Sequence, residues 1–166
     1  MTTPEPTGRL ERTPDGHDLI LSRTYRAPLA DVWASVTEPE RTARWFGPWR
    51  GEPGPGRTIE VRMTFEDEAD WSPIRIDACE PPHRLAVSTT DDAGAWFLEL
   101  RLTESAGTTE LQLVQHLTDT GVLSSTGPGW EYYLDQLTAA REDGPLPDFA
   151  DYYPAQKAYY EALAHP

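Results

Sequence analysis

The sequence predicts an α+β fold in which one curved antiparallel sheet packs against a single long C-terminal helix. Three observations support this. Several segments alternate apolar and polar residues with a period of two, as half-buried strands do. Short turns join most of these segments, so neighbouring strands should run antiparallel. Near the C-terminus, apolar residues recur at offsets of three and four, which is typical of a helix with one buried face.

The chain should open with a hairpin. Strands are expected at 10–12 and 18–26, and the Pro-Asp-Gly sequence at 14–16 favours a tight turn between them. A length of 166 residues suits one domain. We therefore expect the hairpin to belong to a single sheet.

Two short helices and a loop should follow the hairpin. Pro28 and Pro39 each suit the first turn of a helix, where the missing N–H has no cost. The second helix is predicted to run through Phe46 and to end at 47–48 (Gly-Pro). The Gly- and Pro-rich residues 51–56 should form a loop.

The rest of the sheet and the long helix come next. A helix is expected over 128–142, because Trp130, Tyr133, Leu134 and Leu137 form one apolar stripe. Strands are predicted at 59–65, 74–79, 85–89, 96–102 and 111–115, with an acidic loop at 66–70.

The domain organisation follows from these elements. Residues 1–7 are expected to be a disordered tail, and residues 8–144 the globular domain. Residues 145–166 should be an aromatic C-terminal tail, with a short helix over 154–163 that packs on the domain.

Charge and composition exclude several classes of protein. The net charge of −14 at pH 7 disfavours binding to nucleic acid or to an anionic membrane surface. No apolar run approaches the roughly 20 residues that cross a bilayer. The single cysteine, Cys79, cannot form an internal disulfide, and residues 1–6 do not resemble a signal peptide. We expect a cytoplasmic protein that binds neither nucleic acid nor membrane.

Six segments resemble a known family in their order and spacing. They are Arg23-Thr24-Tyr25-Arg26-Ala27-Pro28, Val32-Trp33, Glu38-Pro39-Glu40, Trp45-Phe46-Gly47-Pro48, Pro81-Pro82-His83-Arg84-Leu85 and Gly129-Trp130-Glu131-Tyr132-Tyr133-Leu134-Asp135-Gln136-Leu137. This pattern resembles the START-like (SRPBCC) superfamily, and within it the relatives of the heat-shock-protein ATPase activator. The resemblance implies a helix-grip fold with a cavity between the sheet and the long helix.

The candidate site is aromatic and mostly apolar. Aromatic rings can pack an apolar ligand and still offer a polar edge. The same rings could instead be ordinary core. The candidate ligand-cavity residues are Arg23, Trp45, Phe46, Met63, Trp96, Leu98, Leu113, Gln115, Trp130, Tyr133 and Leu137.

Two polar residues on apolar strand faces each have two interpretations. Gln115 could orient a ligand, or it could bond Tyr133 or a water, since a buried amide without a partner costs ~1–3 kcal/mol. Arg23 could hold a ligand carboxylate, or it could pair with a nearby acid.

The sequence does not indicate catalytic machinery. The histidines lack metal-ligand spacing, no Gly-x-Ser-x-Gly motif is present, and the glycines at 51–56 do not form a phosphate loop. We therefore predict no catalytic residue, no metal and no cofactor.

Three functions stay open at this point. The first is non-catalytic binding of a hydrophobic or aromatic small molecule. The second is a co-chaperone-like interaction with a chaperone partner. The third is a polyketide cyclase or aromatase-like reaction, which would need an acid–base group inside the pocket. The aromatic tail could also support a homodimer.

Overall fold

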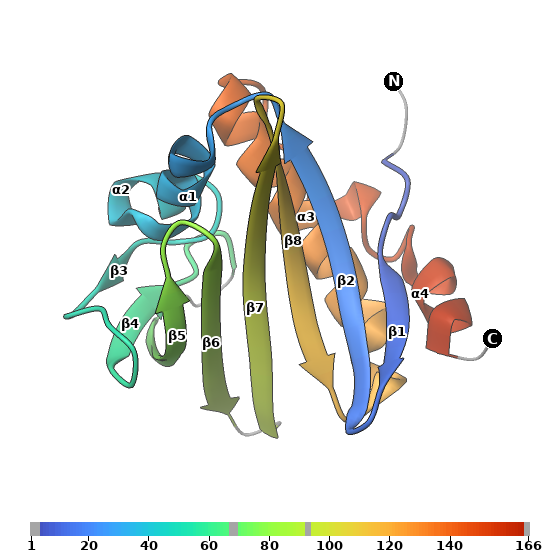
Figure 1. Cartoon of the computed structure of the whole chain (residues 1–166). Coiled ribbons are helices and arrows are strands. Elements are labelled where there is room, and N and C mark those ends of the chain that lie inside the picture. Colours follow the sequence, from blue (N-terminus) through green and yellow to red (C-terminus); the bar gives the residue numbers. More distant parts are fainter. Residues whose placement is uncertain (1–3, 67–69, 92–93, 165–166) are drawn as a thin grey trace.

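The computed structural model describes residues 4–66, 70–91 and 94–164. An eight-stranded antiparallel sheet curves around one long helix, and two short helices cover one end of the sheet (Figure 1). The N-terminal strand lies at one edge, beside the C-terminal tail (Figure 1). This is the α+β helix-grip fold that the sequence predicts.

The strands lie in the order β1-β2-β8-β7-β6-β5-β4-β3. The last strand of the sequence, β8, therefore separates the first hairpin from the other five strands. Their bounds are β1 Arg9–Thr13, β2 Gly16–Tyr25, β3 Trp49–Arg50, β4 Thr58–Arg62, β5 Trp71–Glu80, β6 Arg84–Asp91, β7 Gly94–Ser105 and β8 Thr108–Leu117.

Four helices and two 3-10 turns make up the other regular elements of the described residues. They are α1 Leu29–Thr37, α2 Pro39–Thr42, η1 Thr120–Val122, α3 Leu123–Glu142, η2 Phe149–Asp151 and α4 Lys157–Ala164. No helix among the described residues is both long and apolar enough to cross a membrane.

Several element boundaries differ from the predicted ones. The helix after Pro39 ends at Thr42 rather than at Phe46, and the next residues form a turn in which the Phe46 N–H donates to the Thr42 carbonyl (2.8 Å). Strand β4 ends at Arg62, so Met63 lies outside the sheet. Of the predicted acidic loop 66–70, residues 67–69 lie outside the described residues.

Helix α3 also begins earlier than predicted. The sequence places its start at Pro128, but the helix begins at Leu123 and includes the proline. A proline inside a helix removes one backbone hydrogen bond. Gly127 and Pro128, in this first part of the helix, are both buried. The early start of the helix therefore goes together with packing of this part against the rest of the protein.

The main core lies between α3 and the β2, β7 and β8 part of the sheet. Leu134 and Leu137 on the helix are almost completely buried, as are Leu19 and Leu21 on β2 and Leu111 on β8. These leucines fill the space along the middle of the helix. A second, smaller apolar cluster lies on β4 and β5 and consists of Ile59, Val61, Ile74 and Ile76.

The chain ends are attached to α3 by one buried carboxylate. Glu131 is 1% exposed and accepts hydrogen bonds from the Thr7 hydroxyl (2.8 Å) and the Tyr160 hydroxyl (2.5 Å). It also accepts one from the Thr7 N–H and pairs with Arg23 of β2 (2.9 Å). One side chain thus connects the N-terminal segment, β2, α3 and α4. Of the expected tail 1–7, residues 1–3 lie outside the described residues.

Candidate functional site

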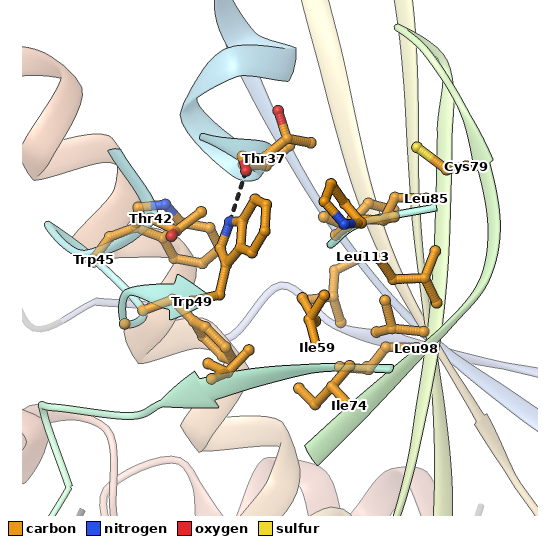
Figure 2. A pocket seen from close by; sticks show the side chains of 18 of the residues that line it. Thr37, Thr42, Trp45, Trp49, Ile59, Ile74, Cys79, Leu85, Leu98 and Leu113 are labelled. Atoms are coloured by element: carbon orange, nitrogen blue, oxygen red, sulfur yellow. Dashed lines mark hydrogen bonds between the residues drawn. The ribbon is translucent and has the colours of Figure 1, made fainter. Parts of the chain in front are cut away.

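An apolar cavity of about 160 Å³ lies between the β4–β7 part of the sheet and the segment that runs from the end of α1 to β3. Ile59 and Ile74 form one side of it, and Leu85 and Leu98 another (Figure 2). The other lining residues are Val36, Thr37, Thr42, Trp45, Phe46, Gly47, Trp49, Pro53, Val61, Ile76, Cys79, Val87, Trp96, Leu100, Leu113 and Trp130.

The sheet supplies most of the wall through inward-facing positions. The registers Ile59↔Ile74 and Ile76↔Val87 place four of these side chains in facing pairs. The β5–β6 register then shifts between Ile76 and Ala78. Such a bulge bends the strand that carries it, at the level where Cys79 lines the cavity.

The turn after α2 closes the cavity on the helix side. Trp45, Phe46 and Gly47 all line it. Gly47 is required by close packing, because a Cβ there would overlap the backbone carbonyl oxygen of Arg62 at the end of β4. The glycine that the sequence indicates as a helix stop therefore also lets this turn lie against the sheet.

The indole N–H groups of the lining tryptophans mostly have acceptors within the protein. Trp45 donates to the Ser35 carbonyl (2.9 Å) and Trp49 to the Thr37 carbonyl (2.8 Å; Figure 2). Trp130 donates to the side-chain oxygen of Gln115 (2.8 Å). These three residues therefore present ring surface, rather than a free donor, to the cavity.

The two lining threonines are engaged in the same way. The Thr37 hydroxyl lies 2.7 Å from the Trp33 carbonyl, and the Thr42 hydroxyl 3.3 Å from the Pro39 carbonyl. Among the described lining residues only Cys79 is titratable, and burial raises the pKa of its thiol. The cavity wall is thus uncharged near neutral pH.

Aromatic contacts hold the rim together. The Phe46 ring lies between three others, with centroids 5.5 Å from Trp45, 6.4 Å from Trp130 and 5.4 Å from Tyr133. Offset and tilted pairs at such distances add to the packing energy of the rings. Tyr133 also donates to the Glu66 carboxylate (2.6 Å). Desolvation and this carboxylate raise the pKa of Tyr133.

The structure brings six of the eleven predicted site residues together around the cavity. They are Trp45, Phe46, Trp96, Leu98, Leu113 and Trp130. The remaining five lie elsewhere. Met63 packs between the two apolar clusters and does not line the cavity. Tyr133 belongs to the rim described above.

Gln115, Arg23 and Leu137 are occupied by contacts inside the protein. Gln115 is 6% exposed and accepts from Trp130, a partner that the sequence did not indicate. Arg23 forms ion pairs with Glu131 (2.9 Å) and Asp135 (3.0 Å), which is the second of its two predicted interpretations. Leu137 lies in the core, at the floor of a separate cleft.

Sequence reasoning missed the β4 and β5 wall. Ile59, Val61, Ile74 and Ile76 share one face in their alternating strands, and this parity was visible in the sequence. What the sequence did not show is that the cavity lies beside α3 rather than along it. Among the described lining residues, α3 contributes only Trp130.

Comparisons with known proteins agree with this architecture. CalU16 from Micromonospora echinospora is 28% identical, with a TM-score of 0.78 and coverage of 98% of each chain. The protein encoded by gene BPP1335 from Bordetella parapertussis is 22% identical, with a TM-score of 0.75 and coverage of 97% of this chain and 94% of that one. Because its identity is only 22%, the likeness to the BPP1335 protein shows the fold alone.

A third solved structure is DynU16, from the dynemicin biosynthetic locus. It is 23% identical, with a TM-score of 0.67, and the match covers 80% of this chain and 50% of that one. This likeness also shows the fold alone. A comparison with curated proteins gave no match.

Residues 26–142 match the family described as activator of Hsp90 ATPase homolog 1-like protein. The match covers well over half of the chain, from the end of β2 to the end of α3. It includes the whole cavity wall. The chain therefore belongs to the activator of Hsp90 ATPase homolog 1-like family, within the START-like superfamily.

Proposed function

We propose that this protein binds an uncharged, hydrophobic small molecule containing an aromatic ring in the cavity beneath α1 and β3, without transforming it. The observation that carries the proposal is the chemistry of the wall, which consists almost entirely of hydrocarbon and ring surface. An apolar ligand gains free energy by leaving water for such a wall, at about 25 cal/mol per Å² of apolar surface buried.

The size of the cavity supports a ligand with one ring inside. An engineered apolar cavity of about 150 Å³ in another protein binds benzene, and the volume here is about 160 Å³.

The indole N–H groups in the cavity wall that already have protein acceptors support selection against charged ligands. A carboxylate inside the cavity would lose its hydration, and Trp45, Trp49 and Trp130 already donate to protein acceptors. Burying a charge without a partner is costly. The only titratable lining residue among those described is a thiol with a raised pKa, which favours binding over general acid–base catalysis.

A matched pair of ligands tests this proposal. Toluene and benzoate have nearly the same shape and differ in charge. Isothermal titration calorimetry should show saturable binding of toluene with one site per chain. Benzoate should bind at least about 100-fold more weakly, because its carboxylate would lose its hydration where three of the lining indole N–H groups already have protein acceptors.

Variants connect the binding to this cavity. Val87→Trp should fill the cavity from β6 and abolish toluene binding. Val122→Trp is the control, since Val122 is 41% exposed and lies in η1. Far-ultraviolet circular dichroism checks that both variants fold. Equal toluene binding by both folded variants, or equal affinity for toluene and benzoate, would contradict the proposal.

The family match favours a second candidate, an interaction with a chaperone of the Hsp90 class. With a net charge of −14, the protein would be expected to bind a basic surface in a salt-dependent way. A pull-down with purified Hsp90 at low and high salt tests this. Retention at low salt supports the candidate, and no retention at either salt removes it.

A further inference from the structure

A second cleft opens between α1, α2 and the C-terminal part of α3, on the other side of Trp45 from the apolar cavity. Its volume is about 290 Å³. Trp45 lines both spaces. The remaining lining residues are Asp31, Ser35, Arg41, Arg44, Leu137, Ala140 and Arg141.

The side chains that line this cleft carry a net positive charge, although Glu38 and Asp143 lie beside two of its arginines. Three arginines and one aspartate line it, whereas the whole chain carries −14 at pH 7. Three guanidinium groups so close together repel one another unless anions lie between them. Asp31 is one such anion, and hydrogen bonds from Arg141 and Arg41 lower the pKa of its carboxyl group.

Asp31 holds two of the guanidinium groups in place. Its carboxylate accepts from Arg41 (3.1 Å) on one oxygen and from Arg141 (2.9 Å) on the other. Arg141 is fixed further by the Ser35 hydroxyl (2.6 Å), and its side chain is only 14% exposed. The positions of these charges are therefore set before any ligand arrives.

Most of the hydrogen-bonding capacity of Arg41 and Arg44 is still available. Each guanidinium group has five N–H donors. Arg41 uses one N–H for its hydrogen bond to Asp31, and its contact with Glu38 is long (3.9 Å). Arg44 pairs with Asp143 (2.7 Å), whose side chain is 86% exposed. An ion pair this exposed contributes little to stability, so a ligand can displace Asp143 from Arg44.

We propose that this cleft binds the oxyanion of a small molecule, a phosphate or a carboxylate group, between Arg41 and Arg44. Arginine suits this role because its planar fork matches the two oxygens of such a group. Leu137 and Ala140 give the floor an apolar surface, against which the body of the molecule can lie. The site does not depend on the proposed function of the apolar cavity.

Titration with inorganic phosphate at constant ionic strength tests the proposal. The side-chain Nε–H signals of the arginines are followed by ¹H–¹⁵N correlation spectroscopy. We expect saturable shifts of the Arg41 and Arg44 signals, with no saturable shift for Arg57. Arg57 is the reference, because it is also exposed and paired with an acid, Glu52 (2.9 Å).

Charge-removing variants identify the site. Arg44→Gln and Arg41→Gln should each weaken phosphate binding about tenfold, the effect of losing a charge-assisted hydrogen bond. Arg57→Gln makes the same change of net charge elsewhere and should leave the affinity unchanged. Equal affinity in all three variants, or shifts that never saturate in the wild-type protein, would overturn the proposal.

A parallel titration with succinate distinguishes the two oxyanions. A tighter response to phosphate would assign the cleft to a phosphoryl group, and a tighter response to succinate to a carboxylate. Both results support an oxyanion site. Because neither titration uses an apolar ligand, failure here is distinct from failure of toluene binding in the cavity.

Discussion

At the scale of single residues, polar side chains on the inner face of the sheet are bonded to other groups of the protein. The cavity wall is left with ring and hydrocarbon surface. Gln115 lies on an inward-facing position, yet its oxygen accepts from Trp130. Arg23 lies on the same face of β2 as Leu21, yet it pairs with Glu131 and Asp135. The sequence revealed that both residues needed partners. It could not identify those partners, because they come from α3, at positions 15 residues after Gln115 and more than 100 residues after Arg23.

Glu131 is the residue whose neutralisation should cost most. Glu131→Gln leaves Arg23 paired with Asp135 alone and gives the Tyr160 hydroxyl a weaker acceptor. We expect the free energy of unfolding to fall by about 2 kcal/mol, less than for a fully broken buried pair. Urea denaturation measures it.

Glu142→Gln is the matched control, since Glu142 is exposed at the end of the same helix. It should change the free energy of unfolding by less than about 0.5 kcal/mol. Similar losses in both variants would mean that Glu131 does not have the connecting role assigned to it.

A second charged cluster, on the outer face of the sheet, should make stability depend on pH. Burial alone would raise the pKa of Glu99, but hydrogen bonds from Arg101, Arg84 and His116 lower it to about 2. Burial alone would lower the pKa of His116, but hydrogen bonds with Asp18 and Glu99 raise it above its usual value of 6.5. Glu99 and protonated His116 therefore stabilise the fold together.

The sign of the His116 effect follows from its raised pKa. Its contribution is complete below the unfolded pKa of about 6.5 and is lost as the pH rises through the folded pKa. The difference in unfolding free energy between the wild-type protein and His116→Gln should therefore shrink as the pH rises above about 6.5. Urea denaturation at a series of pH values measures it, and a difference that grows with pH would refute the assignment.

At the scale of elements, local pattern identified most strands, and tertiary contacts decided the boundaries. The alternation at 59–65 continued past the end of β4, but the chain turns after Arg62, where the Glu66 N–H donates to the Met63 carbonyl (3.1 Å). The two-residue strand β3 has too few residues to produce an alternation. It exists because it pairs with β4.

Two glycines of α3 give a test of how the C-terminal tail packs. A Cβ at Gly127 would overlap the ring of Tyr160, whereas nothing lies within 4 Å of a Cβ at Gly129. Gly127→Ala should therefore destabilise the protein by about 1–3 kcal/mol through overpacking. Gly129→Ala should stabilise it by up to about 1 kcal/mol through helix propensity.

The melting temperatures of the two alanine variants provide the measurement. They should move in opposite directions from that of the wild-type protein. If Gly127→Ala were as stable as Gly129→Ala, Tyr160 would not pack against α3 as described.

At the scale of the whole molecule, the order of the strands decides where the cavity forms. Strand β8 lies between β2 and β7, so α3 packs directly on β2 and β8 through Leu134 and Leu137. The space left over lies under the other half of the sheet, where the segment from the end of α1 to β3 covers it. The sequence predicted six of the lining residues, but it could not give this position. Strand order depends on pairings between distant segments, and alternation within one strand does not report them.

The proposed function requires that the space between β4–β7 and the α1–β3 segment hold an apolar ring. Intermolecular nuclear Overhauser effects between toluene and the methyl groups of the protein test it most directly. We expect effects to the methyl groups of Ile59, Ile74 and Val87, which line the cavity. We expect none to those of Ile20 and Val114, which lie on the opposite face of the sheet. Effects confined to methyl groups outside the cavity, or none at toluene concentrations that saturate the calorimetric signal, would contradict it.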